Sequence, residues 1–128
     1  MPIEIKLLVW TTALAAAQTV VALLGTISQI GMPRAIGNRQ DMPALTGWAD
    51  RANRAHRNLL ESLVLFAILV LSAQATGKLN ATTALGAELF FYARVAYALV
   101  YIAGIPVIRT LVWTISVVGL VMIFLRFV

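Results

Sequence analysis

Four polar side chains stand at helical spacing where one apolar stretch of this sequence begins. They occupy positions i, i+3, i+4 and i+7, and they are Arg54, Arg57, Asn58 and Glu61. This spacing places them on one face of a helix. Because burying such a face in hydrocarbon costs several kcal/mol unless its groups are paired, we predict that it forms a functional site.

Polar side chains from two later segments are expected at the same depth in a membrane. Arg94, Tyr97 and Tyr101 are spaced i, i+3 and i+7, and Arg109 begins the next apolar segment. With a rise of about 1.5 Å per residue, Glu61 and Tyr97 both lie about 9 Å below the same boundary. Three helices are therefore expected to direct polar groups into one layer.

This layer is predicted to carry more positive than negative charge. Its one carboxylate comes from Glu61, and its guanidinium groups come from Arg54, Arg57, Arg94 and Arg109. Such an excess is typical of a pocket for an anionic ligand, an anionic lipid headgroup or a carboxylate from a neighbouring subunit. The alternative is structural, because a pair between Arg94 and Glu61 could simply hold two helices together.

The elements that would position these residues are long apolar helices. The chain has 128 residues, of which 61% are hydrophobic and 12% are charged, a balance far from that of soluble domains. Four apolar runs approach the roughly 20 residues that span a bilayer, and their short connections predict antiparallel neighbours. We therefore predict an all-α membrane protein, a single domain folded as a four-helix up-down bundle, with spans at about residues 5–31, 51–76, 82–103 and 107–127.

Composition and charge also limit the partners and the orientation. With no cysteine and one histidine in the chain, we predict no disulfide and no metal site. The net charge of +5 is interpreted as a sign of topology and of contact with anionic membrane lipids, not of nucleic acid. The positive-inside rule makes the arginine-rich side cytoplasmic and turns both termini outward. The arginines of that side are Arg34, Arg39, Arg51, Arg54, Arg57 and Arg109.

Two segments of the chain resemble a known family. The segment 51–61, with an Arg-Ala-His-Arg-Asn core at residues 54–58, resembles the signature of the MAPEG family, the membrane-associated proteins of eicosanoid and glutathione metabolism. The segment 94–101, followed by Pro106 and Arg109, resembles the third and fourth helices of the same family. The resemblance is to bacterial-type members, and in length and order it covers the whole chain.

The resemblance implies a homotrimer in which glutathione lies between adjacent subunits near the cytoplasmic face. It assigns the stabilisation of the glutathione thiolate to Arg109, which matches an arginine of the fourth helix. Arg34 is matched with an arginine of the first helix. The other residues expected to bind glutathione are Arg54, Arg57, Asn58, Glu61, Arg94, Tyr97 and Tyr101.

The activity that the resemblance implies is that of a glutathione transferase or peroxidase in the bacterial inner membrane, acting on lipophilic electrophiles. Tyr97 stands where several eicosanoid-forming members have histidine, and Trp113 stands where they have tyrosine. These departures argue against a specific prostaglandin or leukotriene synthase. The alternative function is that of a non-catalytic MAPEG-like membrane subunit or lipid-binding module.

Overall fold

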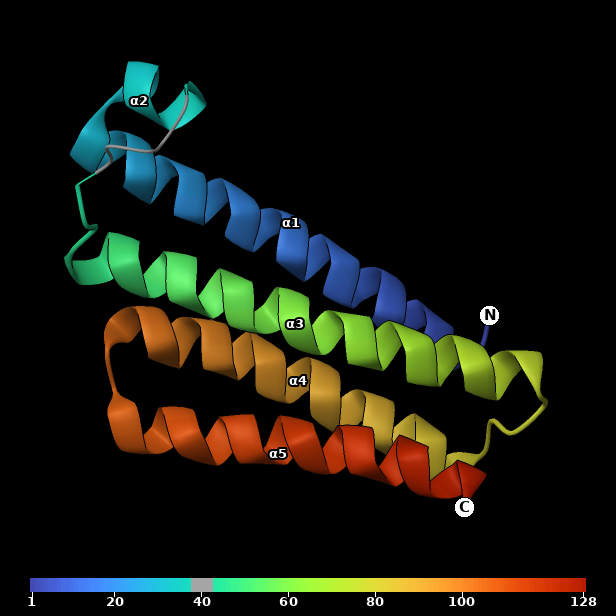
Figure 1. Cartoon of the computed structure of the whole chain (residues 1–128). Coiled ribbons are helices and arrows are strands. Elements are labelled where there is room, and N and C mark those ends of the chain that lie inside the picture. The colour runs from blue at the N-terminus through green and yellow to red at the C-terminus, as the bar shows by residue number, and fades with distance from the viewer. Residues whose placement is uncertain (38–42) are drawn as a thin grey trace.

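The structure, a computed structural model, describes residues 1–37 and 43–128. Its described residues form four long helices, one short helix and a final 3-10 turn (Figure 1). Arg39, one of the basic residues used to predict the topology, lies outside the described residues. The elements are α1 (Ile3–Ile30), α2 (Met32–Ile36), α3 (Gly47–Ala75), α4 (Ala81–Ala103), α5 (Pro106–Phe124) and η1 (Leu125–Phe127).

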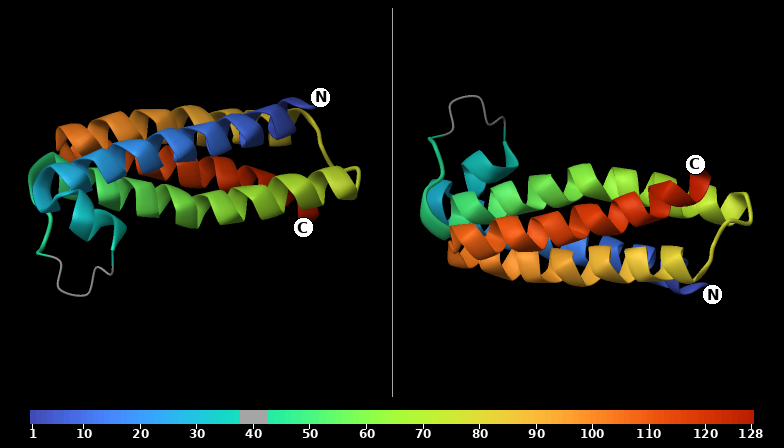
Figure 2. Two further views of the ribbon diagram at one scale, coloured as in Figure 1. Left: turned by 90° about the horizontal axis from the view of Figure 1, so that it is seen from above. Right: turned by 90° about the horizontal axis from the view of Figure 1, so that it is seen from below.

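The four long helices run alternately up and down the bundle. α1 and α4 run toward the end that carries α2, and α3 and α5 run back toward the end that carries both chain termini (Figure 1; Figure 2). These ends are called the α2 end and the termini end below. Each of the four helices is long and apolar enough to cross a membrane. The predicted all-α membrane bundle with up-down topology is therefore confirmed.

The helix α3 begins at Gly47, about one turn before the start near Arg51 that the apolar run suggests. Hydrogen bonds from α1 hold this start in place. Gln29 Nε2 donates to Thr46 O at 2.7 Å, and Thr46 N donates to Gln29 Oε1 at 2.9 Å. The segment 51–61 therefore lies wholly inside the helix and begins about one turn after its start. The connection between α1 and α3 also contains the short helix α2, which the sequence does not predict.

Glycines let two pairs of helices approach each other closely. A Cβ built on Gly86 of α4 would lie 2.7 Å from the carbonyl oxygen of Gly119 in α5, well inside van der Waals contact. A Cβ built on Gly25 of α1 would lie 2.9 Å from the Cβ of Ala49 in α3. Because small residues allow close backbone packing of helices in membranes, these contacts fix the α4–α5 and α1–α3 pairs.

The apolar core lies in the half of the bundle near the termini end. Phe66 of α3 stacks on Phe90 of α4, with ring centroids 4.2 Å apart. The other buried residues of this cluster are Leu7, Val70, Ala87, Leu120 and Ile123. The polar side chains singled out by their spacing lie in the other half, toward the α2 end.

Candidate functional site

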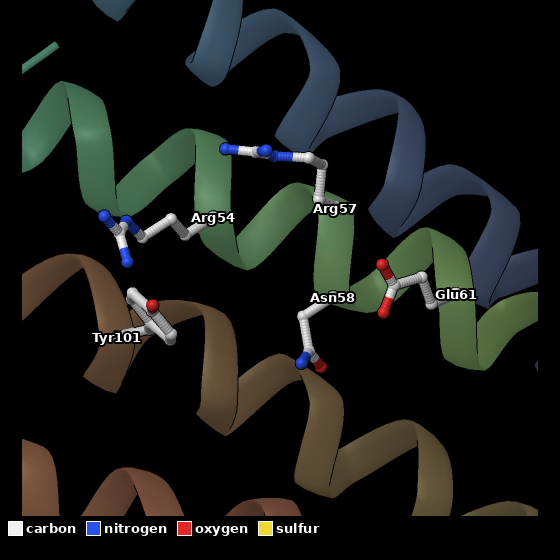
Figure 3. Close-up of a pocket in the computed structure, with 5 residues that line it drawn as sticks. All are labelled: Arg54, Arg57, Asn58, Glu61 and Tyr101. Carbon is white, nitrogen blue, oxygen red and sulfur yellow. The ribbon is translucent and has the colours of Figure 1, made fainter. Parts of the chain in front are cut away.

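A first hollow, of about 390 Å³, opens beside α3 in the half near the α2 end (Figure 3). Arg57 lies on its side nearer α1, Asn58 lies on the side nearer α4, and Tyr101 faces them from α4. The full set of lining residues is Arg54, Arg57, Asn58, Glu61 and Tyr101. The structure thus brings together the four α3 residues that share one helix face, and it places a phenol opposite them.

A second hollow, of about 190 Å³, adjoins the first at Asn58, which lines both. Tyr97 of α4 contributes to its wall, and α5 supplies the rest with Arg109, Thr110 and Trp113. Trp113 follows Arg109 by four residues, so both project from one face of α5. Tyr97 and Arg109, which the sequence singles out on different helices, therefore line the same hollow.

A third hollow, of about 570 Å³, lies on the other side of Arg109. It shares Arg109 and Thr110 with the second hollow, and its remaining wall consists of Pro106, Val107, Leu111 and Thr114. Val107 and Leu111 are exposed on the outer surface of the bundle, where hydrocarbon would surround them. The three hollows form a series that leads from the charged groups of α3 to a mostly apolar wall of α5.

Two adjacent tyrosine rings with an arginine at each side connect the walls of these hollows. The Arg94 Cζ lies 4.2 Å from the ring centroid of Tyr97, and the Arg109 Cζ lies 4.7 Å from that of Tyr101. The two tyrosine rings are 5.4 Å apart. A cation over an aromatic face is attracted to the ring, more strongly where water is excluded. This stack therefore helps to hold Arg109 between the second and third hollows.

The charges around the first hollow include a carboxylate that the sequence analysis does not count. Arg54 Nε forms an ion pair of 3.0 Å with Asp50 Oδ2, one turn earlier on α3. Asp50 is thus a second carboxylate near this layer, beside Glu61. Arg57 and Glu61 are exposed and form no ion pair within the described part of the chain. Because exposed ion pairs contribute little, Arg54 also remains available to a ligand.

Arg94 occupies the interior behind the hollows and does not pair with Glu61. Its Nη2 donates to Asn58 Oδ1 at 2.7 Å, and its side chain is only 1% exposed. Glu61 is exposed on the surface of α3, so the two residues share a depth but not a direction. Arg94 lines none of the three hollows and lies behind Asn58 and Tyr97. The purely structural Arg94–Glu61 pair is therefore not formed.

Arg34 lies apart from the three hollows. It is an exposed residue of α2, a helix that leaves the axis of α1 at Gly31. Gly31 has a φ of 84°, a left-handed conformation that glycine adopts without steric cost. The turn at this glycine directs α2 away from the walls described above, and Arg34 contributes to none of them.

Two residues that shape the candidate site are not among those that the sequence predicts to bind glutathione. Thr110 lines the second and third hollows, and its position three residues before Trp113 is the signal that could have revealed it. Arg51 Nε donates to Ile102 O at 2.9 Å. This bond satisfies a carbonyl at the end of α4 and ties the turn that carries Tyr101 to α3. The signal that could have revealed this role of Arg51 is its position. It stands near the start of α3, level with the end of the antiparallel helix α4, where carbonyl groups lack partners within the helix.

Comparison with known proteins gives one match. The model of the MAPEG family matches residues 7–128, nearly the whole chain. No curated protein and no solved structure matches the sequence. The matched range includes every residue that lines the three hollows.

Proposed function

Because the chain belongs to the MAPEG family, we propose that it is an integral membrane protein that binds glutathione and joins its sulfur to lipophilic electrophiles. The observation that carries the proposal is the wall of the first hollow, where α3 presents two arginines, an asparagine and a glutamate. Glutathione carries two carboxylates and one ammonium group, so this wall complements its charges. The activity is that of a glutathione transferase, or of a peroxidase in which two glutathione molecules reduce a peroxide to an alcohol and water and are themselves oxidised to the disulfide.

The first hollow suits the charged ends of the tripeptide. Arg54 and Arg57 present planar guanidinium groups, each of which can bind a carboxylate through two parallel hydrogen bonds. Glu61 can accept hydrogen bonds from the ammonium group, and the Tyr101 hydroxyl can donate to a further oxygen. Neither Arg57 nor Glu61 has an ion-pair partner within the described part of the chain. A ligand with both signs of charge would supply a partner to each.

Arg109 is the residue that we propose to activate the sulfur. A thiol with a reference pKa of about 8.5 is mostly protonated at neutral pH. A guanidinium group nearby favours the thiolate, which is the nucleophilic form. Because Arg109 lines both the second and the third hollow, a sulfur beside it would face the mostly apolar wall of α5. A lipophilic acceptor could reach that wall from the bilayer.

We further propose a homotrimer in a bacterial inner membrane, with the α2 end in the cytoplasm and the termini outward. Exposure of Arg57 and Glu61 at the open side of the first hollow supports completion of the site by a neighbouring copy. Arg34 lies outside the hollows of its own chain, and we place it against the glutathione that a neighbouring copy binds. The site would then be shared between subunits.

A second candidate function is that of a non-catalytic MAPEG-like subunit or lipid-binding module. Trp113 favours it, because an indole lines the second hollow at a position where the resemblance gives the eicosanoid-forming members a tyrosine hydroxyl. An indole N–H can donate a hydrogen bond but cannot act as a phenol does in proton transfer. The two candidates share the bundle and differ in whether bound glutathione reacts.

Equilibrium dialysis or calorimetry of the purified protein in detergent, titrated with glutathione, tests the proposal. Binding should be measurable at millimolar glutathione, and Arg57→Ala should weaken it about tenfold by removing a charge-assisted hydrogen bond. Lys6→Ala, which removes an exposed cation near the termini end, is the matched control and should bind as the wild-type protein does. No binding by the wild-type protein would overturn the proposal. Binding without conjugation of a generic electrophile would favour the second candidate.

A further inference from the structure

Arg94 is the largest side chain that the bundle encloses completely, yet it is incompletely paired. It is 1% exposed, and its Nε and Nη1 have no hydrogen-bond partner in the described part of the chain. An unsatisfied buried N–H group lowers stability, and a buried charged group can often be replaced by apolar side chains without loss of stability. A stabilising role is therefore a poor explanation for Arg94.

The hydrogen-bond partner of Arg94 occupies the junction between two hollows. Asn58 lines both the first and the second hollow, and its side chain reaches from α3 toward α4 (Figure 3). A guanidinium group only donates hydrogen bonds, so the 2.7 Å contact from Arg94 Nη2 can be made only to the amide oxygen of Asn58. The amide nitrogen, with its two N–H groups, is thereby turned away from Arg94.

Arg94 also contacts a second residue of the candidate site. Its Cζ lies 4.2 Å from the ring centroid of Tyr97, a residue that lines the second hollow and is otherwise buried. The same guanidinium group thus contacts one residue shared by both hollows and one residue of the second. Both contacts are made from behind the wall, since Arg94 lines neither hollow.

We propose that Arg94 is a positioning residue that fixes the Asn58 amide with its N–H groups toward the bound ligand. The inference rests on the proposed binding of glutathione. A carboxylate or carbonyl oxygen of the tripeptide accepts hydrogen bonds from Asn58 Nδ2 in this orientation. If the amide turned over, its own oxygen would face the ligand oxygen and repel it. Arg94 therefore acts on glutathione affinity through Asn58 and does not touch the ligand.

The substitution Arg94→Met separates positioning from stabilisation because the two roles predict opposite results. Methionine fills much of the space of arginine and needs no hydrogen bonds. We expect glutathione affinity, measured by equilibrium dialysis, to fall about tenfold. The midpoint of thermal unfolding should stay the same or rise, because the unpartnered N–H groups of Nε and Nη1 are removed. A lower midpoint with unchanged affinity would overturn the proposal.

A double-mutant cycle with Asn58→Ala tests whether Arg94 acts through Asn58. The combined variant should bind glutathione no more weakly than Asn58→Ala alone, because Arg94 then has no amide to orient. Additive losses of affinity would overturn the proposal. Arg94→Lys keeps a charged donor at this position and should retain more affinity than Arg94→Met. It also takes the place of Arg94→Met in the cycle if the methionine variant does not fold.

Titration of the wild-type protein with glutathione, carried out first, separates this proposal from the one on which it rests. Absence of binding by the wild-type protein would overturn the proposed function, and this inference with it. Binding by the wild-type protein together with equal binding by Arg94→Met would overturn the positioning role alone.

Discussion

The hydrogen bonding of buried polar side chains differs between the two ends of the bundle. Near the termini end, Glu4 Oε2 accepts a hydrogen bond of 2.8 Å from Thr83 Oγ1, and Thr83 forms a capping box with Asn80 at the start of α4. Toward the α2 end, Arg94 and Gln18 are buried but keep side-chain N–H groups that have no partner in the described part of the chain. The same two helices, α1 and α4, thus carry a closed polar network near the termini end and, beside the fully bonded Thr26, two incompletely paired side chains toward the α2 end.

This difference separates the groups that hold the fold from the groups that serve a ligand. A polar pair that is satisfied within the chain contributes to stability and needs no further partner. A buried donor without a partner costs stability, and such costs are found at functional sites and are offset elsewhere in a protein. In this chain we expect substitutions in the apolar core near the termini end to lower stability without changing glutathione binding, and substitutions of the incompletely paired groups toward the α2 end to change glutathione binding.

The largest expected effect is on stability and follows from Phe66→Ala. This change removes one ring of the Phe66–Phe90 stack and leaves a cavity between α3 and α4. The free energy of unfolding in detergent should fall by about 3 to 5 kcal/mol, while the folded fraction keeps its affinity for glutathione. Leu99→Ala, at a side chain that is 69% exposed, should change it by less than about 0.5 kcal/mol. A loss of glutathione affinity in the fully folded Phe66→Ala protein would show that the two halves of the bundle do not have separate roles.

The next effect is on catalysis and follows from Arg109→Ala. Removal of the guanidinium group should lower the rate of conjugation of a generic electrophile about a hundredfold, as removal of one transition-state donor does in other enzymes. Glutathione affinity should change little, because Arg109 does not line the first hollow. Lys6→Ala again serves as the control near the termini end and should keep the wild-type rate. An unchanged rate in Arg109→Ala would refute its role toward the thiolate.

The smallest expected effect is on stability, and it follows from removal of the hydrogen bond between Thr83 and Glu4 near the termini end. Thr83→Val keeps the shape of the side chain but removes the hydroxyl that bonds to Glu4. The free energy of unfolding should fall by about 1 to 3 kcal/mol, because a buried carboxylate loses its partner, and glutathione affinity should not change. Thr12→Val removes an exposed hydroxyl that bonds only within its own helix and should have a much smaller effect. Equal effects of the two substitutions would show that the network does not stabilise the fold.

The fold is predictable from the sequence because a membrane allows few alternatives. A chain in lipid must satisfy its backbone hydrogen bonds internally, so four apolar runs with short connections predict four antiparallel helices. The start of α3 at Gly47 is not predictable in this way. It depends on hydrogen bonds between Thr46 and Gln29, two residues separated by 17 positions. The helix α2 is likewise too short, at five residues, to produce a recognisable apolar period.

The depth of the candidate site residues along the bundle can be predicted from the sequence, but the direction in which each side chain points cannot. Helical rise and spacing bring residues of three helices to one level, and the structure places most of them around adjoining hollows. Rise alone does not tell which way a side chain points around its helix. Arg94 therefore meets Asn58 and not Glu61, a pairing that depends on helix rotation and side-chain torsions that only the packed bundle determines. The ion pair between Arg54 and Asp50 is different, because its i, i+4 spacing on one helix could have revealed it.

The contact between Gly86 and Gly119 makes α4 and α5 a single mechanical unit. Backbones that touch cannot slide past each other without first separating, and a short turn joins the two helices at their other end. Tyr101 and Arg109 belong to this unit and keep their spacing, whereas Asn58 belongs to α3, which contacts α5 only sparsely. The wall that α4 and α5 give to the second hollow is therefore rigid, and the width of that hollow depends on how α3 packs on α4, through the Phe66–Phe90 stack and the hydrogen bond from Arg51 to Ile102.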